Sequence, residues 1–199
     1  MPLYYKRIDS FNYCRNLLTD LYFSKVHNRI LTETDEETKK LRHFGTPAIG
    51  QNILEMFPKD FYKTCQKFFK IFGQDDFFAR FFVVAPYETG VVHMDTYADS
   101  YEIRNWALNI PVYNTDQNYQ EWGMIDYNKK IYNTSNPMYL WKEEENFVVT
   151  ESMVLDSPTL VKVSVPHRIT NPTSKFRVIL SLRSVSNCLT FENISARCS

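Results

Sequence analysis

The sequence predicts a mainly β protein in which helices flank an antiparallel sandwich or barrel. Six short segments after residue 76 are rich in β-branched and aromatic residues, and clusters of Asn, Asp, Pro and Ser separate them. The helical patterns, in contrast, are confined to the N-terminal third. Short strands bounded by turn residues favour antiparallel pairing over a parallel sheet with crossover helices.

Two helices are predicted before residue 76. The first runs from Asp9 to Phe23, with Ser10 as a cap candidate, and its apolar residues recur at helical spacing: Phe11, Cys14, Leu17, Leu18 and Leu21. The second runs from Pro58 to Phe72 with the stripe Phe61, Cys65, Phe68, Phe69 and Phe72. Because such stripes are usually buried, we expect residues 1–75 to form a mostly helical support that covers one face of a sheet.

From residue 76 onward the sequence pattern is typical of strands. Residues 76–185 are expected to form the jelly-roll-type core of a single domain that spans residues 1–199. The six expected strands are Phe77–Pro86, Val91–Asp95, Asn105–Tyr113, Asn146–Ser152, Thr159–Arg168 and Phe176–Val185. Only five glycines are present, so many turns must use Asn, Asp and Pro. Residues 114–145 are polar and aromatic with few aliphatic positions, which predicts an insertion or lid near the mouth of a cleft.

Composition narrows the class of partner. The chain has 199 residues, and its 23 basic and 23 acidic side chains cancel, so no global field concentrates nucleic acid or anionic membrane around it. No apolar run approaches the roughly 18 residues of a membrane span, and no export signal is visible at the N-terminus. The four cysteines lie far apart without metal-type spacing, which fits a reducing compartment. We therefore expect a cytoplasmic protein that acts on a small molecule, peptide or protein.

The stretch V-V-H-M-D-T-Y contains the first two candidate metal ligands, His93 and Asp95. Residues i and i+2 of a strand point to one face, so this imidazole and this carboxylate can reach the same ion. A third ligand must come from another strand, and His167 ends the apolar and polar alternation in V-K-V-S-V-P-H. Two histidines plus one carboxylate leave adjacent positions open, which suits non-haem Fe(II) oxygenases.

Arg177 follows His167 by ten residues, at the start of the last expected strand. A buried guanidinium needs an anionic partner, and its planar fork matches a carboxylate. The neighbouring acids Asp156 and Glu192 lie outside the apolar runs. A ligand carboxylate is therefore the expected partner of Arg177.

In this order and spacing the residues resemble the H-x-D…H…R pattern of the 2-oxoglutarate- and Fe(II)-dependent oxygenases. The segment R-N-W-A-L-N-I-P-V, residues 104–112, is similar to the strand after H-x-D in the prolyl and aspartyl/asparaginyl hydroxylase-like branches and in phage-encoded members, for which the location would be the host cytoplasm. The resemblance spans residues 77–185. It implies a double-stranded β-helix, the cupin-like jelly roll.

The resemblance also implies roles for particular residues. His93, Asp95 and His167 would hold Fe(II), and Arg177 would bind the distal carboxylate of the co-substrate 2-oxoglutarate. The implied reaction uses O2, converts 2-oxoglutarate to succinate and carbon dioxide, and hydroxylates a C–H bond.

Further expected site residues follow from the same resemblance. Asn105 occupies a position where the family often places a hydrogen-bond donor to the co-substrate. Several members carry a serine two residues after the arginine, where this chain has Ile179. Ser181 or Tyr87 is therefore expected to act as the second anchor.

The substrate candidates are Tyr97, just beyond the H-x-D motif, and Trp122, in the aromatic segment 114–145. Three alternatives stay open. In the first, His93, Asp95, His167 and Arg177 are ordinary surface or paired strand residues without a shared function. In the second, the chain is a cupin-like metal protein that does not use 2-oxoglutarate. In the third, it is an inert jelly-roll module that binds a partner through the aromatic segment. The cupin-like alternative would keep the two histidines but need not keep Arg177.

Overall fold

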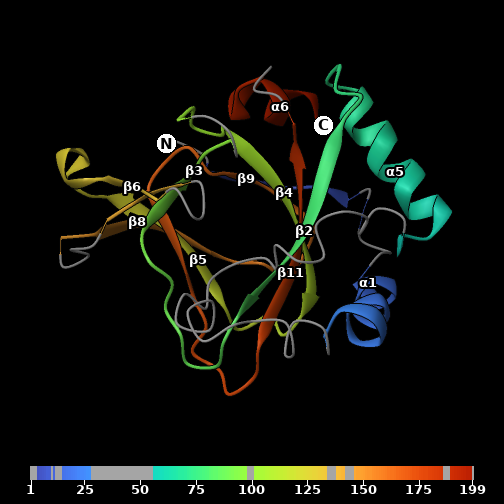
Figure 1. The fold of residues 1–199 in the computed structure, drawn as a ribbon, viewed down its shortest axis with the longest axis horizontal. Coiled ribbons are helices and arrows are strands. Elements are labelled where there is room, and N and C mark those ends of the chain that lie inside the picture. The colour runs from blue at the N-terminus through green and yellow to red at the C-terminus, as the bar shows by residue number, and fades with distance from the viewer. Residues whose placement is uncertain are drawn as a thin grey trace.

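Two antiparallel sheets face each other, and helices lie beside one of them (Figure 1). This computed structural model describes residues 4–9, 11, 15–27, 56–97, 101–133, 138–141, 146–185 and 189–198. Part of the first predicted helix, including Cys14, lies outside these residues, as does Cys188. Mostly β composition, two facing antiparallel sheets and few helices make the fold a jelly roll, as the sequence predicted.

The first sheet has five strands in the order β1-β9-β4-β11-β2. Their bounds are β1 Tyr5–Arg7, β9 Thr159–Lys162, β4 Trp106–Tyr113, β11 Arg177–Ser184 and β2 Phe77–Val84. The pairing of β11 with β2 is continuous, from Arg177 opposite Val84 to Ser184 opposite Phe77. This long pair lies at one edge of the sheet and is built from strongly apolar segments, which is why both strands were predictable.

The second sheet has six strands in the order β6-β7-β3-β10-β5-β8. Their bounds are β6 Ile131–Asn133, β7 Met138–Leu140, β3 His93–Asp95, β10 His167–Thr170, β5 Tyr119–Met124 and β8 Val148–Val154. The short strand β3 pairs with β10 through a single register pair, His93 opposite His167. Two of the three candidate metal ligands are thus direct cross-strand neighbours.

Helices cover the outer face of the five-stranded sheet. They are α1 Arg15–Leu21, which continues into a π-helical turn η2 Tyr22–Val26, then α5 Lys59–Lys70 and the C-terminal α6 Phe191–Arg197. The apolar stripe of α5 packs on the sheet, because Phe69 stacks on Phe77 at 4.6 Å and on Trp106 at 5.6 Å between ring centroids. The second predicted helix thus lies against the sheet with its apolar stripe inward.

Alternation along β11 separates two cores. Val178, Leu180 and Leu182 join the cluster that contains the helices, whereas Ile179 joins the cluster between the sheets. Arg177, Ser181 and Arg183 share the face of Ile179, because side chains of a strand alternate between its two faces. The inter-sheet side of this apolar strand therefore carries two arginines.

The segment Thr159–Arg168 is not one strand as predicted but two, and they lie in different sheets. β9 ends at Lys162, and β10 begins at His167. Pro166 has no backbone N–H to donate to a ladder, so the chain leaves the first sheet before it and enters the second after it. The crossing places His167 opposite β3.

Residues 114–145, expected as an insertion or lid, contribute three strands to the second sheet. Tyr119–Met124 forms β5 between β10 and β8, and Ile131–Leu140 contributes the paired strands β6 and β7. In β5 the buried positions are Gln120 and Trp122, so polar and aromatic residues occupy the places where aliphatic ones signal a strand. The short strand β1 and the helix α6 were not predicted.

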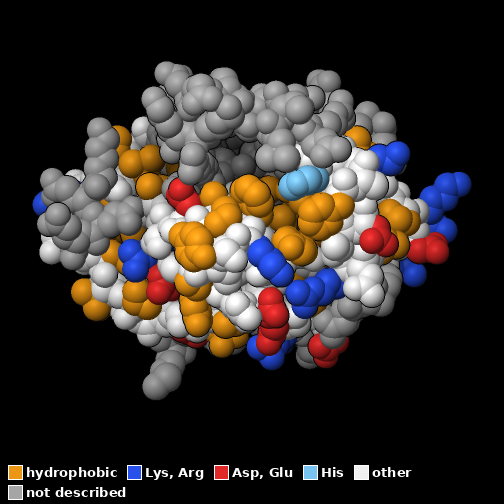
Figure 2. All heavy atoms as spheres, turned by 90° about the horizontal axis from the view of Figure 1, so that it is seen from below, with side chains coloured by type: hydrophobic (Ala, Val, Ile, Leu, Met, Phe, Trp, Pro, Cys, Tyr) orange, Lys and Arg blue, Asp and Glu red, His pale blue; other side chains and the backbone are white. Residues whose placement is uncertain are grey.

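The surface carries both signs of charge. Basic and acidic side chains are interspersed among hydrophobic ones on the face in Figure 2, in keeping with equal totals of 23 each. Within the described ranges, every helix is too short or too polar to cross a lipid bilayer. Cys65 is a buried thiol and Cys198 a half-buried one.

Candidate metal centre

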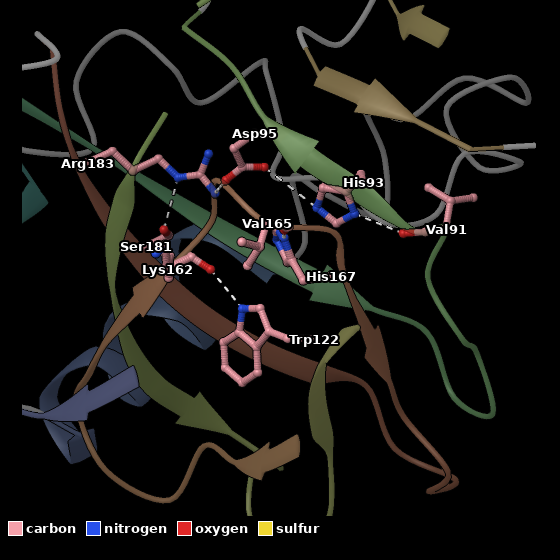
Figure 3. Close-up of polar contacts among 9 residues, drawn as sticks. All are labelled: Val91, His93, Asp95, Trp122, Lys162, Val165, His167, Ser181 and Arg183. Carbon is pink, nitrogen blue, oxygen red and sulfur yellow. Dashed lines mark hydrogen bonds and ion pairs between the residues drawn. The ribbon is translucent and has the colours of Figure 1, made fainter. Parts of the chain in front are cut away.

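Three predicted ligands meet between the sheets. His93 and Asp95 come from β3 and His167 from β10, and their potential ligand atoms all lie within 4.8 Å of one another. The two imidazole centroids are 4.3 Å apart, and His93 Nε2 lies 3.6 Å from Asp95 Oδ1. Figure 3 shows the three side chains converging from the two strands. The i, i+2 spacing and the single β3–β10 register pair together produce this convergence.

Backbone carbonyls orient both imidazole rings. His93 Nδ1 lies 2.9 Å from the Val91 carbonyl oxygen, and His167 Nδ1 lies 2.9 Å from the Val165 carbonyl oxygen. A carbonyl oxygen only accepts hydrogen bonds, so each Nδ1 carries the proton and donates it. Each Nε2 then keeps its lone pair, which is the arrangement found in metal-ligating histidines.

Asp95 is ionised although it is 4% exposed. Burial raises the pKa of its carboxyl, but Arg183 in particular, with His93, His167 and Arg104, outweighs burial and lowers the pKa to about 2. Arg183 Nη2 lies 2.8 Å from Asp95 Oδ2 as an ion pair, without the alignment of a hydrogen bond. Sequence analysis missed Arg183, although its position six residues after Arg177, on the same face of β11, was a usable signal.

His167 is held in its neutral form. Burial lowers the pKa of the imidazole to about 3, and the charge of His93 adds to that effect, against the opposing influence of Asp95 and the Val165 carbonyl. A neutral imidazole is the metal-binding form. At neutral pH His167 therefore offers a lone pair beside the ionised carboxylate of Asp95.

Arg177 is a buried cation with unused donors. It is 1% exposed, and among the described residues neither its Nε nor its Nη2 has a hydrogen-bond partner. Burial lowers the pKa of the guanidinium to about 9, so it remains charged at neutral pH. A buried group of this kind is costly unless an anion pairs with it.

The depth of Arg177 follows from the strand register. It pairs with Val84, whose carbonyl oxygen accepts a hydrogen bond from the Asn171 side chain at 3.3 Å. Asn171 follows His167 by four residues, which is about 13 Å along a strand. The backbone of Arg177 therefore lies about 13 Å along the strands from the three candidate metal ligands. The Arg177 side chain and a short ligand bound to the metal could together span this distance.

Two more interior side chains have unused polar atoms. Asn109 Oδ1 and Gln120 Oε1 are buried without a hydrogen-bond partner in the described part of the chain. Asn109 lies on β4 opposite Ser181, and Gln120 lies on β5 opposite Ile169. Buried polar groups are normally satisfied, so a polar ligand or water is expected between the sheets. Neither residue was among the predicted site residues.

The other expected co-substrate residues lie as follows. Asn105 is half-buried just before β4, and its carbonyl oxygen accepts a hydrogen bond from Val163 N at 3.1 Å. Ser181 is fully buried, and its Oγ accepts a hydrogen bond from Arg183 Nε at 3.1 Å (Figure 3). Tyr87 is 73% exposed in a turn. Of the two anchors expected beside Arg177, only Ser181 thus lies on a buried interior strand.

The two expected substrate residues occupy different environments. The Tyr97 ring carries the Arg104 guanidinium 4.1 Å from its centroid. Trp122 is fully buried opposite His167, and its Nε1 donates to the Lys162 carbonyl oxygen at 2.8 Å (Figure 3). Trp122 is therefore a core residue that adjoins the metal ligands and not part of an exposed mouth.

Known proteins resemble this chain in fold but not in sequence. No protein-family model matches the sequence, and no curated protein sequence matches it either. A prolyl-4-hydroxylase from Pseudomonas putida superposes with a TM-score of 0.50 at 11% identity, covering 90% of this chain and 91% of that one. This likeness shows a shared fold.

Two other solved structures are more distant. EvdO2 from Micromonospora carbonacea var. aurantiaca, complexed with 2-oxoglutarate, gives a TM-score of 0.41 at 11% identity over 75% of this chain and 71% of that one. A cupin domain from Bordetella pertussis Tohama I gives 0.32 at 11% identity over 55% and 82%. Fold and site together define a jelly-roll protein with a group of residues able to hold a metal ion.

Proposed function

We propose that this protein is a 2-oxoglutarate- and Fe(II)-dependent oxygenase that hydroxylates a C–H bond of a small molecule or of a peptide or protein residue. The observation that carries the proposal is Arg177, a buried guanidinium whose Nε and Nη2 have no partner among the described residues, on the same inter-sheet side as the His-Asp-His group. A bound metal ion alone would explain the His-Asp-His group but not the unpaired charge of Arg177. A dicarboxylate that reaches from the metal ion to Arg177 would explain both features.

The donor set fits Fe(II). Two neutral imidazoles and one carboxylate are the protein ligands of non-haem Fe(II) oxygenases. The Val91 and Val165 carbonyls hold the imidazole rings of His93 and His167, and Arg183 pairs with Asp95 Oδ2, which leaves Oδ1 on the side of His93. When bound, iron and 2-oxoglutarate would supply the oxidising chemistry, and the protein supplies position and exclusion of water.

The interior below the metal ligands fits a dicarboxylate. The Arg177 guanidinium can donate two parallel hydrogen bonds to one carboxylate, which also neutralises the buried charge. The Arg177 side chain is 1% exposed, and Ile179, on the same face of β11, is 4% exposed. In such a low-dielectric site the pairing is strong enough to orient the co-substrate.

Two alternatives predict different binding. A cupin-like metal protein would bind a metal at the same three ligands but would give Arg177 no dicarboxylate. An inert jelly-roll module would bind neither. In the aromatic segment, Trp122 and Trp141 are buried in the protein's own core and cannot contact a partner, whereas Tyr119 and Tyr127 are exposed.

Calorimetric titration of 2-oxoglutarate into the Mn(II)-loaded protein separates these alternatives. We expect binding by the wild type and at least about 100-fold weaker binding by Arg177→Gln, since a charge-assisted bidentate pair contributes about 3 kcal/mol. The control Arg7→Gln removes an exposed arginine that is paired with Asp156, and it should bind like the wild type. Metal binding without 2-oxoglutarate binding would support the cupin alternative, and loss of both would support the inert module.

A further inference from the structure

We propose that Arg80, Arg104 and Arg183 form a second anion-binding site, beside the metal centre and distinct from Arg177, and that the substrate presents a carboxylate or phosphate group there. The assignment to the substrate rests on the proposed function, whereas the anion site does not. Arg183 follows Arg177 by six residues, which is about 20 Å along β11. The two arginine sites therefore lie at opposite ends of the same strand face.

Two of the three guanidinium groups lie over the Phe78 ring, and that of Arg183 lies over the Phe82 ring, 4.8 Å from its centroid. Arg80 and Arg104 lie over the Phe78 ring, with Cζ 5.4 and 5.1 Å from its centroid. Arg183 is the register partner of Phe78 on β11, and it reaches Asp95 at 2.8 Å. Residues from β2, from the segment before β4 and from β11 thus converge next to a metal ligand.

The hydrogen-bonding capacity of this cluster is only partly used. Arg104 is 3% exposed, and its Nη1 donates to the Ser184 carbonyl oxygen, but its buried Nε has no partner among the described residues. Arg80 forms no ion pair with any described acid. Burial, and next the charge of Arg183, lower the pKa of Arg104 to about 10 and also lower the pKa of Arg80. The arginine side chains therefore repel one another in the ligand-free protein.

The charges do not balance within the described residues. Asp95 is the one carboxylate whose charge acts on both Arg80 and Arg104, and it is also the ion-pair partner of Arg183. Three cations thus share one anion. If Asp95 binds a metal ion, its charge is shared further. A second anion is needed to offset the repulsion of buried guanidinium groups.

The aromatic contacts leave hydrogen-bonding edges available. Phe78, Tyr97 and Phe82 contact guanidinium planes through their ring faces, at 4.1 to 5.4 Å. A guanidinium held by its face still presents its N–H edge, which binds carboxylate or phosphate oxygens in pairs. Because Arg183 contacts Asp95, an anion at this edge would lie close to the metal ligands. The reacting carbon would then be near the acidic group of the substrate.

Titration of anions into the metal-free protein in a low-chloride buffer tests the site. The probes are inorganic phosphate and acetate, and their binding is measured by calorimetry. The probe that binds more tightly indicates whether the site prefers a phosphate or a carboxylate group. We expect a Kd of about 1 mM or tighter for one of them, weakened at least about ten-fold in Arg80→Gln. Arg7→Gln, an exposed arginine paired with Asp156, should leave this binding unchanged. The part of the binding that depends on Arg80 should persist in Arg177→Gln, which removes the other buried guanidinium.

A thermal measurement separates ligand binding from a purely structural role. Without anions, Arg80→Gln should melt at the wild-type temperature or higher, because it removes like-charge repulsion, and its stabilisation by phosphate or acetate should vanish. A lower melting temperature together with unchanged anion affinity would overturn the proposal.

Three other outcomes would also overturn it. They are the absence of binding up to about 10 mM of either probe, a loss confined to Arg177→Gln, and a loss of 2-oxoglutarate binding in Arg80→Gln but not in Arg177→Gln. The last result would make the cluster the co-substrate anchor. Since the anion titration uses no metal and no 2-oxoglutarate, its failure would not count against the proposed function.

Discussion

His93 and His167 face each other across the β3–β10 pair, with their ring centroids 4.3 Å apart and each Nδ1 bonded to a backbone carbonyl two residues earlier. The two Nε2 atoms are therefore the free ends of the rings. Two imidazolium charges at this distance would repel strongly, so the pair is suited to sharing a metal ion and not to carrying two protons.

The stability of the metal-free protein should fall as the pH drops below the pKa of an ordinary histidine. The folded-state pKa of His167 is lowered to about 3, so between that value and 6.5 the unfolded chain binds a proton that the folded one does not. Stability thus rises with pH through this window and levels off above it. Urea denaturation should show a loss of about 1 kcal/mol between about pH 7.5 and 5.5.

His167→Gln provides the control for this pH dependence. The variant lacks the titrating group, so its stability should change much less over the same interval. Equal slopes in the variant and the wild type would show that His167 is not the group responsible.

Replacing Arg177 by methionine should stabilise the ligand-free protein. The side chain is 1% exposed and its charge has no partner among the described residues, so an apolar chain of similar length removes a desolvated charge. We expect an increase of about 1 kcal/mol or more in the free energy of unfolding. The same variant should lose the stabilisation that 2-oxoglutarate gives the metal-loaded wild type. A destabilised Arg177→Met would mean that the guanidinium already has a partner.

Trp122→Phe should destabilise the protein by about 1–2 kcal/mol, as measured by chemical denaturation. The phenyl ring retains most of the stacking on Tyr4 and Tyr5, but the buried Lys162 carbonyl loses its donor. Trp141→Phe is a matched control, because Trp141 is equally buried and its Nε1 donates to the Asp126 carbonyl at 2.8 Å. A much smaller effect at Trp122 than at Trp141 would contradict its place in the core.

The candidate metal ligands were predictable because the position of each one depends on a local pattern. The i, i+2 spacing of His93 and Asp95 puts them on one face of any strand, and the alternation before His167 marks a strand end. The apolar strands β2, β4 and β11 are unambiguous for the same reason. Their order in the sheets and the β3–β10 register depend on tertiary packing, which no local pattern contains.

Other features were hidden by residues that contradict the usual strand signal. Pro166 interrupts V-S-V-P-H, yet the alternation on both sides made one strand seem continuous where the chain changes sheets. β5 buries Gln120 and Trp122 where aliphatic residues are expected. Arg80 and Arg183 resemble the solvent-facing charges of ordinary strands, and only the face shared with Arg177 indicates that they point inward.

Anaerobic addition of Fe(II) and 2-oxoglutarate, followed by visible absorption, tests the central claim most directly. Chelation of iron by the co-substrate should produce a weak charge-transfer band that is absent with either ligand alone. The band should be lost in His93→Ala, weakened in Arg177→Ala and unchanged in His27→Ala, whose ring contacts the Tyr22 hydroxyl and lies apart from the metal ligands. A wild-type protein that binds Fe(II) but shows no band with saturating 2-oxoglutarate would contradict the account.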